Sequence, residues 1–279
     1  MADIKPTDVA RLRSITGAGM QTCKAALVEA NGDMDAAVDI LRKQGAATAA
    51  SKALKEAREG VIANHIQSGG KLGVVVELNC QTDFVARNEG FRKFCDEVAE
   101  AVAGDPAVDL EARRLEMVSK MGENIVIARN QRMEVSGNGA VAAYIHTGAK
   151  VGVLVEVGCE KQETTATDEF KQIVKDITLQ IAAAHPVAVS RDQVDPAVVA
   201  KEKEIAEEQF KDKPAQAIAK IVEGKLNSFF QTVCLVDQGF VKDPDKTVQA
   251  YLEETSKKLG DQLEVRRFVR FQVGEALAG

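Results

Sequence analysis

Five cysteines and three histidines are the residues of this chain that could carry out nucleophilic or metal chemistry. The histidines, at positions 65, 146 and 185, form no HExxH sequence and no cluster with cysteines, so the sequence predicts no structural or catalytic metal site. A G-x-S-x-G nucleophile elbow is also missing. Cys80 and Cys159 are candidate thiol nucleophiles, but both end apolar runs, which favours their interpretation as small buried side chains.

Two short glycine- and lysine-containing runs resemble phosphate-binding loops. SGGKLG (68–73) and TGAKVG (147–152) lack the G-x-x-x-x-G-K-[ST] spacing with which backbone N–H groups surround a phosphate. We interpret both as hairpin turns. The sequence thus predicts no catalytic residue, no metal ligand and no cofactor, and the chain is not expected to be an enzyme.

The composition is that of a soluble globular protein with two or three modules. Of the 279 residues, 45% are hydrophobic and 28% charged, and the formal net charge is −6. This acidic balance argues against an extended nucleic-acid surface, and the apolar runs are too short to span a bilayer. The N-terminal MADIKPTDVAR lacks the apolar core of a secretion signal, and the odd number of scattered cysteines is typical of a reducing compartment. We therefore expect a cytoplasmic protein.

An internal repeat supplies the elements that would position a site. GVIANHIQSGGKLGVVVELNC (60–80) aligns without a gap with GAVAAYIHTGAKVGVLVEVGC (139–159), at an offset of 79 residues. Each copy has the pattern of a β-hairpin and is followed by a helical pattern, over 91–102 and 170–181. The repeat predicts an α+β fold whose core consists of two duplicated halves, each a β-hairpin covered on one face by a helix.

The connector between hairpin and helix differs between the two copies. QTDFVARN (81–88) aligns with EKQETTAT (160–167), so Phe84 has no aromatic counterpart in the second copy. Because both copies share the strand before and the helix after, the scaffold itself does not require Phe84. That side chain is either exposed for recognition or fills a groove unique to the first half. Thr82 is a candidate helix cap and Asp83 a candidate first-turn carboxylate.

An N-terminal helical domain is expected over residues 1–54. Three short helices are predicted, with Thr7 capping the first and Gly45 ending the third, before an Ala-, Lys- and Glu-rich linker over 46–60. Met20 follows the turn TGAG and is predicted to share the face of Cys23, either as a gap-filling core residue or as a docking contact.

The remaining segments are assigned by their apolar patterns. The two halves of the core are expected over 55–138 and 139–186. Residues 187–232 hold two charged helices with a narrow apolar seam, which predicts an antiparallel helical hairpin that projects and pairs either with a second copy or with a partner. Within 233–279, the alternation over 265–275 predicts a strand that returns to the core.

Several blocks, in order along nearly the whole chain, resemble the bacterial translation elongation factor Ts family. The matching blocks are LRSITGAGMQTCKAALVEANGD (12–33), ELNCQTDFVARN (77–88), GENIVIAR (122–129), GFVKDPDKTV (239–248) and RRFVRFQVGE (266–275). The resemblance implies a guanine-nucleotide exchange factor for elongation factor Tu. Such a factor binds the GDP form, disturbs the Mg²⁺ and phosphate site, promotes GDP release and remains bound until GTP binds. A binding-only adaptor for the same partners is the alternative.

The resemblance also implies roles for individual residues. The family's TDFV element, which reaches toward the Mg²⁺ site of the partner, matches Thr82, Asp83, Phe84 and Val85. In the N-terminal domain, which is similar to the family's ubiquitin-associated (UBA-like) domain, the residues matching partner-contacting positions are Arg13 and Met20. In the second hairpin, a position that touches another domain of the partner matches His146.

Further implications concern the arm and the partners. The helical hairpin matches the family's protruding coiled-coil arm. The sequence ends at VGEALAG, whereas some members continue into a further helical module, so the contact made by that module is not among those expected here. The implied partner is elongation factor Tu, both GDP-bound and nucleotide-free, with no direct nucleic-acid contact and no membrane contact.

Overall fold

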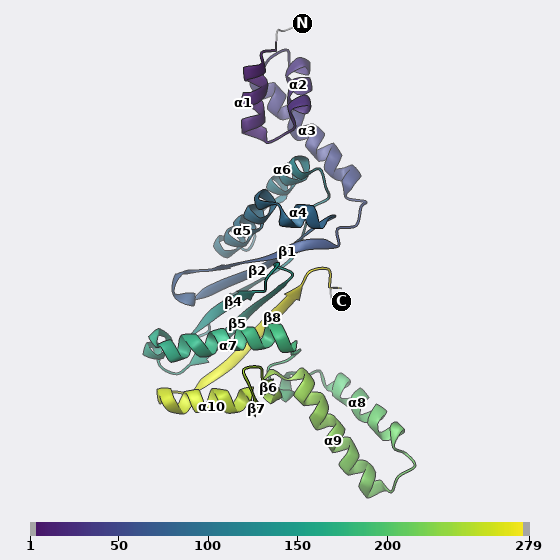
Figure 1. Ribbon diagram of the computed structural model, residues 1–279, viewed down its shortest axis with the longest axis vertical. Coiled ribbons are helices and arrows are strands. Elements are labelled where there is room, and N and C mark those ends of the chain that lie inside the picture. Colours follow the sequence, from purple (N-terminus) through teal and green to yellow (C-terminus); the bar gives the residue numbers. More distant parts are fainter. Residues whose placement is uncertain (1–3, 276–279) are drawn as a thin grey trace.

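Two three-stranded antiparallel sheets lie face to face at the centre of the chain (Figure 1). The computed structural model describes residues 4–275. The first sheet has the order β1–β2–β3 and the second the order β4–β5–β8. The strands are β1 (Glu59–Ile66), β2 (Leu72–Cys80), β3 (Val126–Glu134), β4 (Gly139–Ile145), β5 (Val151–Cys159) and β8 (Leu263–Gln272). The chain is therefore an α+β protein, as predicted.

The central strands β2 and β5 are buried on both faces. In β2, alternate residues such as Val74 and Val76 pack under helices, while Val75 points into the core between the sheets. Gly73 and Gly152, at equivalent positions of the repeat, lie where the sheets approach most closely. A Cβ atom at either position would collide with a side chain of the facing sheet. Glycine occurs at both positions because the packing of the two sheets leaves little room for a side chain there.

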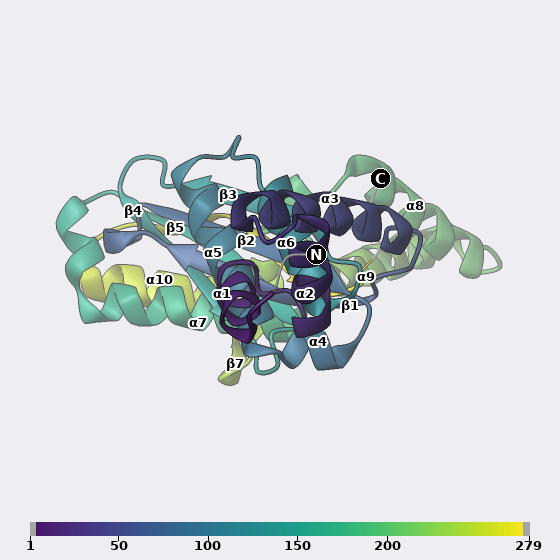
Figure 2. The same ribbon diagram turned by 90° about the horizontal axis from the view of Figure 1, so that it is seen from above.

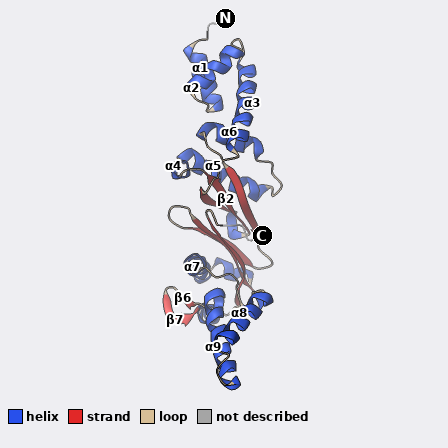
Figure 3. Cartoon of the chain, turned by 90° about the vertical axis from the view of Figure 1, so that its right-hand side faces the viewer, coloured by secondary structure: helices blue, strands red, loops and turns tan. Residues whose placement is uncertain are grey.

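Helices cover the outer face of each sheet, so the core has four layers (Figures 1 and 3). Over the first sheet lie α5 (Glu89–Gly104) and α6 (Glu111–Met121). Over the second lie α7 (Asp168–Ala184) and α10 (Val248–Leu259). Each half therefore contains a second helix that was not predicted, in addition to the predicted hairpin and helix, and each sheet has a third strand.

The duplication is longer than the hairpin repeat, because the second helix and third strand of each half also correspond. Gly122 ends α6 and Gly260 ends α10, both in the left-handed conformation, and each is followed by a carboxylate and then by β3 or β8. The third strands carry β-bulges at equivalent places, opposite Glu77 and Glu156 of the middle strands. Each of these buried carboxylates pairs with an arginine of the third strand at 2.7 Å.

The third strands differ in how well the sequence predicts them. The expected strand near the C-terminus is β8, which pairs antiparallel with β5. The strand β3 was not expected, because its sequence, VIARNQRME, is polar at most positions. It lies at a sheet edge, where polar side chains can face water.

The N-terminal domain contains α1 (Pro6–Thr16), α2 (Met20–Glu29) and α3 (Met34–Lys52). The prediction that Thr7 caps the first helix is wrong: α1 begins at Pro6, whose missing N–H and fixed φ suit a first helical position. The predicted end of the third helix at Gly45 is also wrong. The glycine lies inside α3, where it is buried beside Ser119 at the contact between α3 and α6.

An antiparallel pair of helices, α8 (Pro196–Gln209) and α9 (Ala215–Val233), projects from the second half (Figures 1 and 2). Backbone hydrogen bonds from residues 187 and 188 to the Val233 carbonyl fix its base. The pair is inserted between α7 and α10, where the first half has only a short loop. It is followed by a small ribbon, β6 (Gly239–Phe240) and β7 (Asp243–Thr247). In residues 4–275, none of the helices has the length and apolar character needed to cross a membrane.

Candidate functional site

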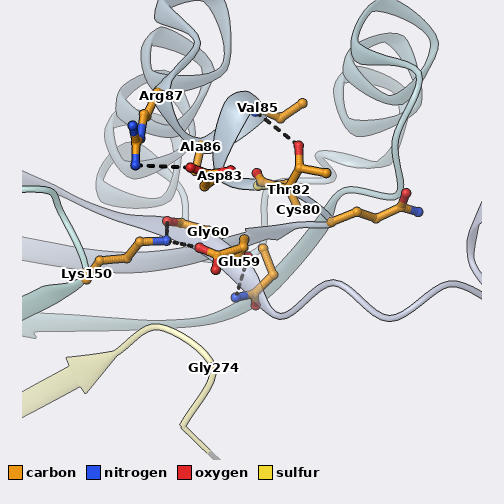
Figure 4. Close-up of polar contacts among 12 residues, drawn as sticks. Glu59, Gly60, Cys80, Thr82, Asp83, Val85, Ala86, Arg87, Lys150 and Gly274 are labelled. Atoms are coloured by element: carbon orange, nitrogen blue, oxygen red, sulfur yellow. Dashed lines mark hydrogen bonds and ion pairs between the residues drawn. The ribbon is translucent and has the colours of Figure 1, made fainter.

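The first connector folds into a single helical turn, α4 (Asp83–Arg87), which presents Phe84 to solvent. Thr82 caps this turn by accepting a hydrogen bond from the Val85 N–H at 3.4 Å, and Asp83 pairs with Arg87 at 3.0 Å (Figure 4). Val85 and Ala86 pack into the core of the first half. Because these residues hold one side of the turn, the other side must face outward.

The Phe84 side chain is 81% exposed, although phenylalanine is usually buried. The alternative that it fills a groove in the first half is therefore wrong. Its backbone belongs to a well-anchored turn and not to a free loop, so the ring is held in place before any contact is made. An exposed aromatic side chain on a rigid support is typical of an interaction site.

A carboxylate from a distant part of the chain anchors the connector. Glu123, just after α6, accepts hydrogen bonds from the N–H groups of Gln81 and Thr82, both at 3.0 Å. It also accepts a hydrogen bond from the Thr82 hydroxyl at 2.6 Å. Gly122 has a φ of 72°, in the left-handed region that favours glycine, and turns the chain so that Glu123 reaches the connector.

The second connector has the same anchor without the aromatic residue. It forms a short 3₁₀ turn over Gln162–Ala166, and Asp261 accepts hydrogen bonds from the N–H groups of Glu160 and Lys161 at 3.1 and 3.2 Å. The Thr164 hydroxyl also donates to Asp261. Burial would raise the pKa of Asp261, but these hydrogen bonds outweigh burial and hold the pKa below its ordinary value. The scaffold is thus shared, and Phe84 is specific to the first half.

Neither anchor was among the predicted site residues. Glu123 and Asp261 lie 42 and 101 residues from the first backbone group that each one binds, so local patterns do not reveal them. A signal was present in the sequence, because each carboxylate directly follows a glycine and precedes a strand. The two glycine–carboxylate pairs are 138 residues apart, as are the equivalent residues of the strands that follow them.

The other predicted site residues lie on separate elements. Arg13 is exposed on α1, and Met20, 46% exposed, begins α2. Cys23, three residues later in the same helix, is fully buried, whereas Met20 is half exposed, so the interpretation of Met20 as a gap-filling core residue is wrong. Figures 2 and 3 agree that α1, α2 and α4 lie on the same side of the long axis. His146 follows β4 in the second half, and its Nδ1 lies 3.0 Å from the Tyr144 hydroxyl.

The cysteines are buried and free throughout residues 4–275. Burial raises the pKa of the Cys80 thiol to about 11, and it also raises the pKa of Cys159. Each thiol donates to a carbonyl of its own connector, that of Thr82 or Lys161, at 3.2 Å. Both are therefore protonated structural groups, in agreement with the favoured interpretation. Within the described residues, no three His, Cys, Asp or Glu side chains converge as metal ligands would.

Comparison with known proteins gives one consistent result. A family model described as "Elongation factor TS" matches residues 81–275. The Elongation factor Ts of Nitratidesulfovibrio vulgaris (strain DP4) is 42% identical over 274 residues, which cover 97% of this chain and 96% of the relative. That of Trichlorobacter lovleyi is 40% identical over 292 residues, with 98% and 94% covered. That of Chloroherpeton thalassium is 42% identical over 294 residues, with 99% and 100% covered.

Proposed function

Because this chain belongs to the elongation factor Ts family of translation elongation factors, we propose that it is the guanine-nucleotide exchange factor of elongation factor Tu. It binds the GDP form in the cytoplasm, disturbs the Mg²⁺ and phosphate site, releases GDP and stays bound until GTP binds. The observation that supports this role is the exposed Phe84 on its anchored turn. The contacts are with protein, not with nucleic acid or membrane.

Exchange of this kind requires binding preference and no bond chemistry in the factor. The factor must bind nucleotide-free elongation factor Tu more tightly than the GDP complex. By linkage, GDP then weakens the binding of the factor by the same ratio. Each tenfold of this ratio corresponds to about 1.4 kcal/mol. On this proposal the protein is a binding partner that carries no catalytic residue.

Phe84 supplies a large part of this preference. Complete burial of a phenylalanine side chain stabilises a complex by about 1.5–3 kcal/mol, which is about tenfold to a hundredfold in affinity. If the ring is buried only in the open form of the partner, this free energy favours nucleotide release. Asp83, beside it, brings a carboxylate toward the Mg²⁺ site. Thr82 and Val85 fix the turn from which both side chains project.

The N-terminal domain and the second half extend the contact. Arg13 and Met20 are exposed on the first two helices, in what we propose is a UBA-like domain that binds the nucleotide-binding domain of the partner. His146 contacts another domain of the partner from the second half. The helical arm either lies against the partner or pairs with a second copy, and sedimentation of the free chain distinguishes these arrangements.

The test is the rate of GDP release from elongation factor Tu, measured by stopped flow with fluorescent GDP at low and high Mg²⁺. The wild-type chain should accelerate release, and Phe84→Ala should lose at least tenfold of the acceleration. Leu54→Ala, which removes another exposed apolar side chain (90% exposed), is the matched control and should act as wild type.

Two outcomes contradict the proposal in different ways. Equal exchange rates for Phe84→Ala and wild type would refute the role of the ring. Tight binding of the wild-type chain without any change in GDP release would identify a binding-only adaptor.

A further inference from the structure

A cavity of about 680 Å³ opens at one end of the second sheet. Six elements meet there: the starts of β1 and β5, the ends of β4 and β8, the C-terminal end of α7, and the turn between β6 and β7. Polar side chains and an apolar wall formed by α7 line the cavity together. The polar groups used below are His146, His185, Lys150, Lys242, Arg270 and Gln272.

Arg270 carries a positive charge into this cavity and forms no ion pair with a carboxylate in residues 4–275. The charge of Glu275 raises the pKa of Arg270, but Glu275 pairs with Arg129 instead, at 3.4 Å. The Arg270 Nη2 lies 2.8 Å from His185 Nε2 and donates to the Gln272 side-chain oxygen at 3.0 Å. Its Nε–H is buried and has no partner in residues 4–275. Burial lowers the pKa of Arg270, as expected for a cation removed from water.

The other arginines in the described part of the chain are in a different situation. Each one either pairs with a carboxylate or is exposed to solvent. The two lysines of the cavity are also compensated, since Lys150 pairs with Glu59 and Lys242 with Asp176. Among the arginines of the described chain and the two cavity lysines, Arg270 is therefore the partly buried cation that lacks a carboxylate partner.

The internal duplication shows what is missing beside Arg270. Its counterpart in the first half is Arg132, which lies opposite Val74 as Arg270 lies opposite Val153. Arg132 pairs with Glu134, two residues later in its strand, at 2.7 Å. The residue two positions after Arg270 is Gln272. The second half thus keeps the arginine and replaces its carboxylate with a neutral amide.

We propose that the cavity receives a carboxylate side chain from an acidic segment of elongation factor Tu, and that Arg270 pairs with it. This inference rests on the proposed function, because His146, the expected contact of the second half, lines the same cavity. A bound carboxylate would supply the counter-ion that Glu134 supplies to Arg132. Arginine suits this role, since its planar fork binds carboxylates through two N–H groups.

A protein carboxylate fits the cavity better than a free phosphate. Only one positive charge is unmatched, which equals the charge of one Asp or Glu, whereas phosphate carries more. Leu179, Ala182, Ala183 and Val241 provide an apolar lining against which the aliphatic stem of an acidic residue can pack.

The test compares three variants of the full chain by calorimetric titration with nucleotide-free elongation factor Tu. Arg270→Met keeps the size of the side chain and removes the charge, so the affinity should fall at least tenfold. Gln272→Glu supplies the missing carboxylate within the chain and should weaken binding about fivefold or more. Arg132→Met, the counterpart in the first half, is the control and should bind as wild type.

Melting temperatures of the free chains separate binding from folding. Arg270→Met removes an uncompensated charge and Gln272→Glu pairs it, so neither variant should melt below wild type. An Arg270→Met affinity within twofold of wild type would overturn the inference. A loss of affinity accompanied by a lower melting temperature would also overturn it, because Arg270 would then be structural.

Two further outcomes identify which statement has failed. Submillimolar binding of inorganic phosphate to the free chain, lost in Arg270→Met while partner affinity is unchanged, would assign the cavity to a free anion and refute the inference. If the wild-type chain neither binds elongation factor Tu nor accelerates GDP release, the proposed function itself fails.

Discussion

Replacement of Glu123 by glutamine tests whether the anchor of the first connector matters for exchange. The carboxylate accepts three hydrogen bonds, two from backbone N–H groups and one from the Thr82 hydroxyl. A hydrogen bond to a charged group contributes about 1.5–3 kcal/mol. Glutamine keeps one acceptor oxygen but turns an NH₂ group toward a donor. The anchored conformation should therefore lose about 2 kcal/mol, the equivalent of one charged hydrogen bond.

This loss should appear in the exchange reaction, because Phe84 acts only from the anchored turn. A loss of 2 kcal/mol corresponds to a reduction of up to about thirtyfold in the acceleration of GDP release. Stopped-flow measurement with fluorescent GDP gives this number directly. Binding of the N-terminal domain to elongation factor Tu should persist, since Arg13 and Met20 are untouched.

The second half provides the matched control. Asp261→Asn removes the same kind of anchor from a connector that has no Phe84. Both variants should lower the melting temperature by a similar amount, but only Glu123→Gln should slow exchange. If the two variants slowed GDP release equally, loss of overall stability would explain the effect and the positioning role of Glu123 would be refuted.

Two further predictions concern titratable groups. The pKa of Cys80 is about 11 and all five thiols are buried, so native protein at pH 8 should resist iodoacetamide, whereas unfolded protein should label fully. Rapid labelling of Cys80 in the native chain, detected by mass spectrometry, would contradict this. For Asp261, hydrogen bonds outweigh burial and lower the pKa, so its contribution to stability is present above about pH 4 and is lost as the pH falls through the native pKa. The stabilities of wild type and Asp261→Asn should thus converge as the pH falls through the native pKa of Asp261, and a difference that stays constant throughout acid titration would contradict the assignment.

The internal repeat was sufficient to predict the hairpins, because each copy holds two strand-like segments joined by a glycine-containing turn. Comparison of the two connectors indicated that the scaffold does not need an aromatic residue at position 84, and the structure decides between the two alternatives by showing that the side chain is exposed. The conclusion about position 84 required no knowledge of contacts between residues distant in sequence, because one copy of the repeat served as a control for the other.

Long-range contacts explain what the sequence did not reveal. Glu123 and Asp261 act on backbone groups far away along the chain, and the glycine before each carboxylate is recognisable as a signal only when the two halves are compared. The low helix propensity of glycine predicts a helix end at Gly45, but α3 continues through this position, where the glycine packs beside Ser119 of α6. The edge strand β3 was missed because its outward residues need not be apolar.

The insertion of the helical arm between α7 and α10 has a consequence for how this architecture can vary. The first half joins its equivalent helices, α5 and α6, by a loop of a few residues, so the shared framework tolerates either a tight link or a long excursion at that point. New segments can enter there without altering strand register or the packing between the sheets. Duplication of an ancestral half, followed by an insertion at this junction in one copy, would then produce a molecule with a symmetric core and a projecting arm on one half only.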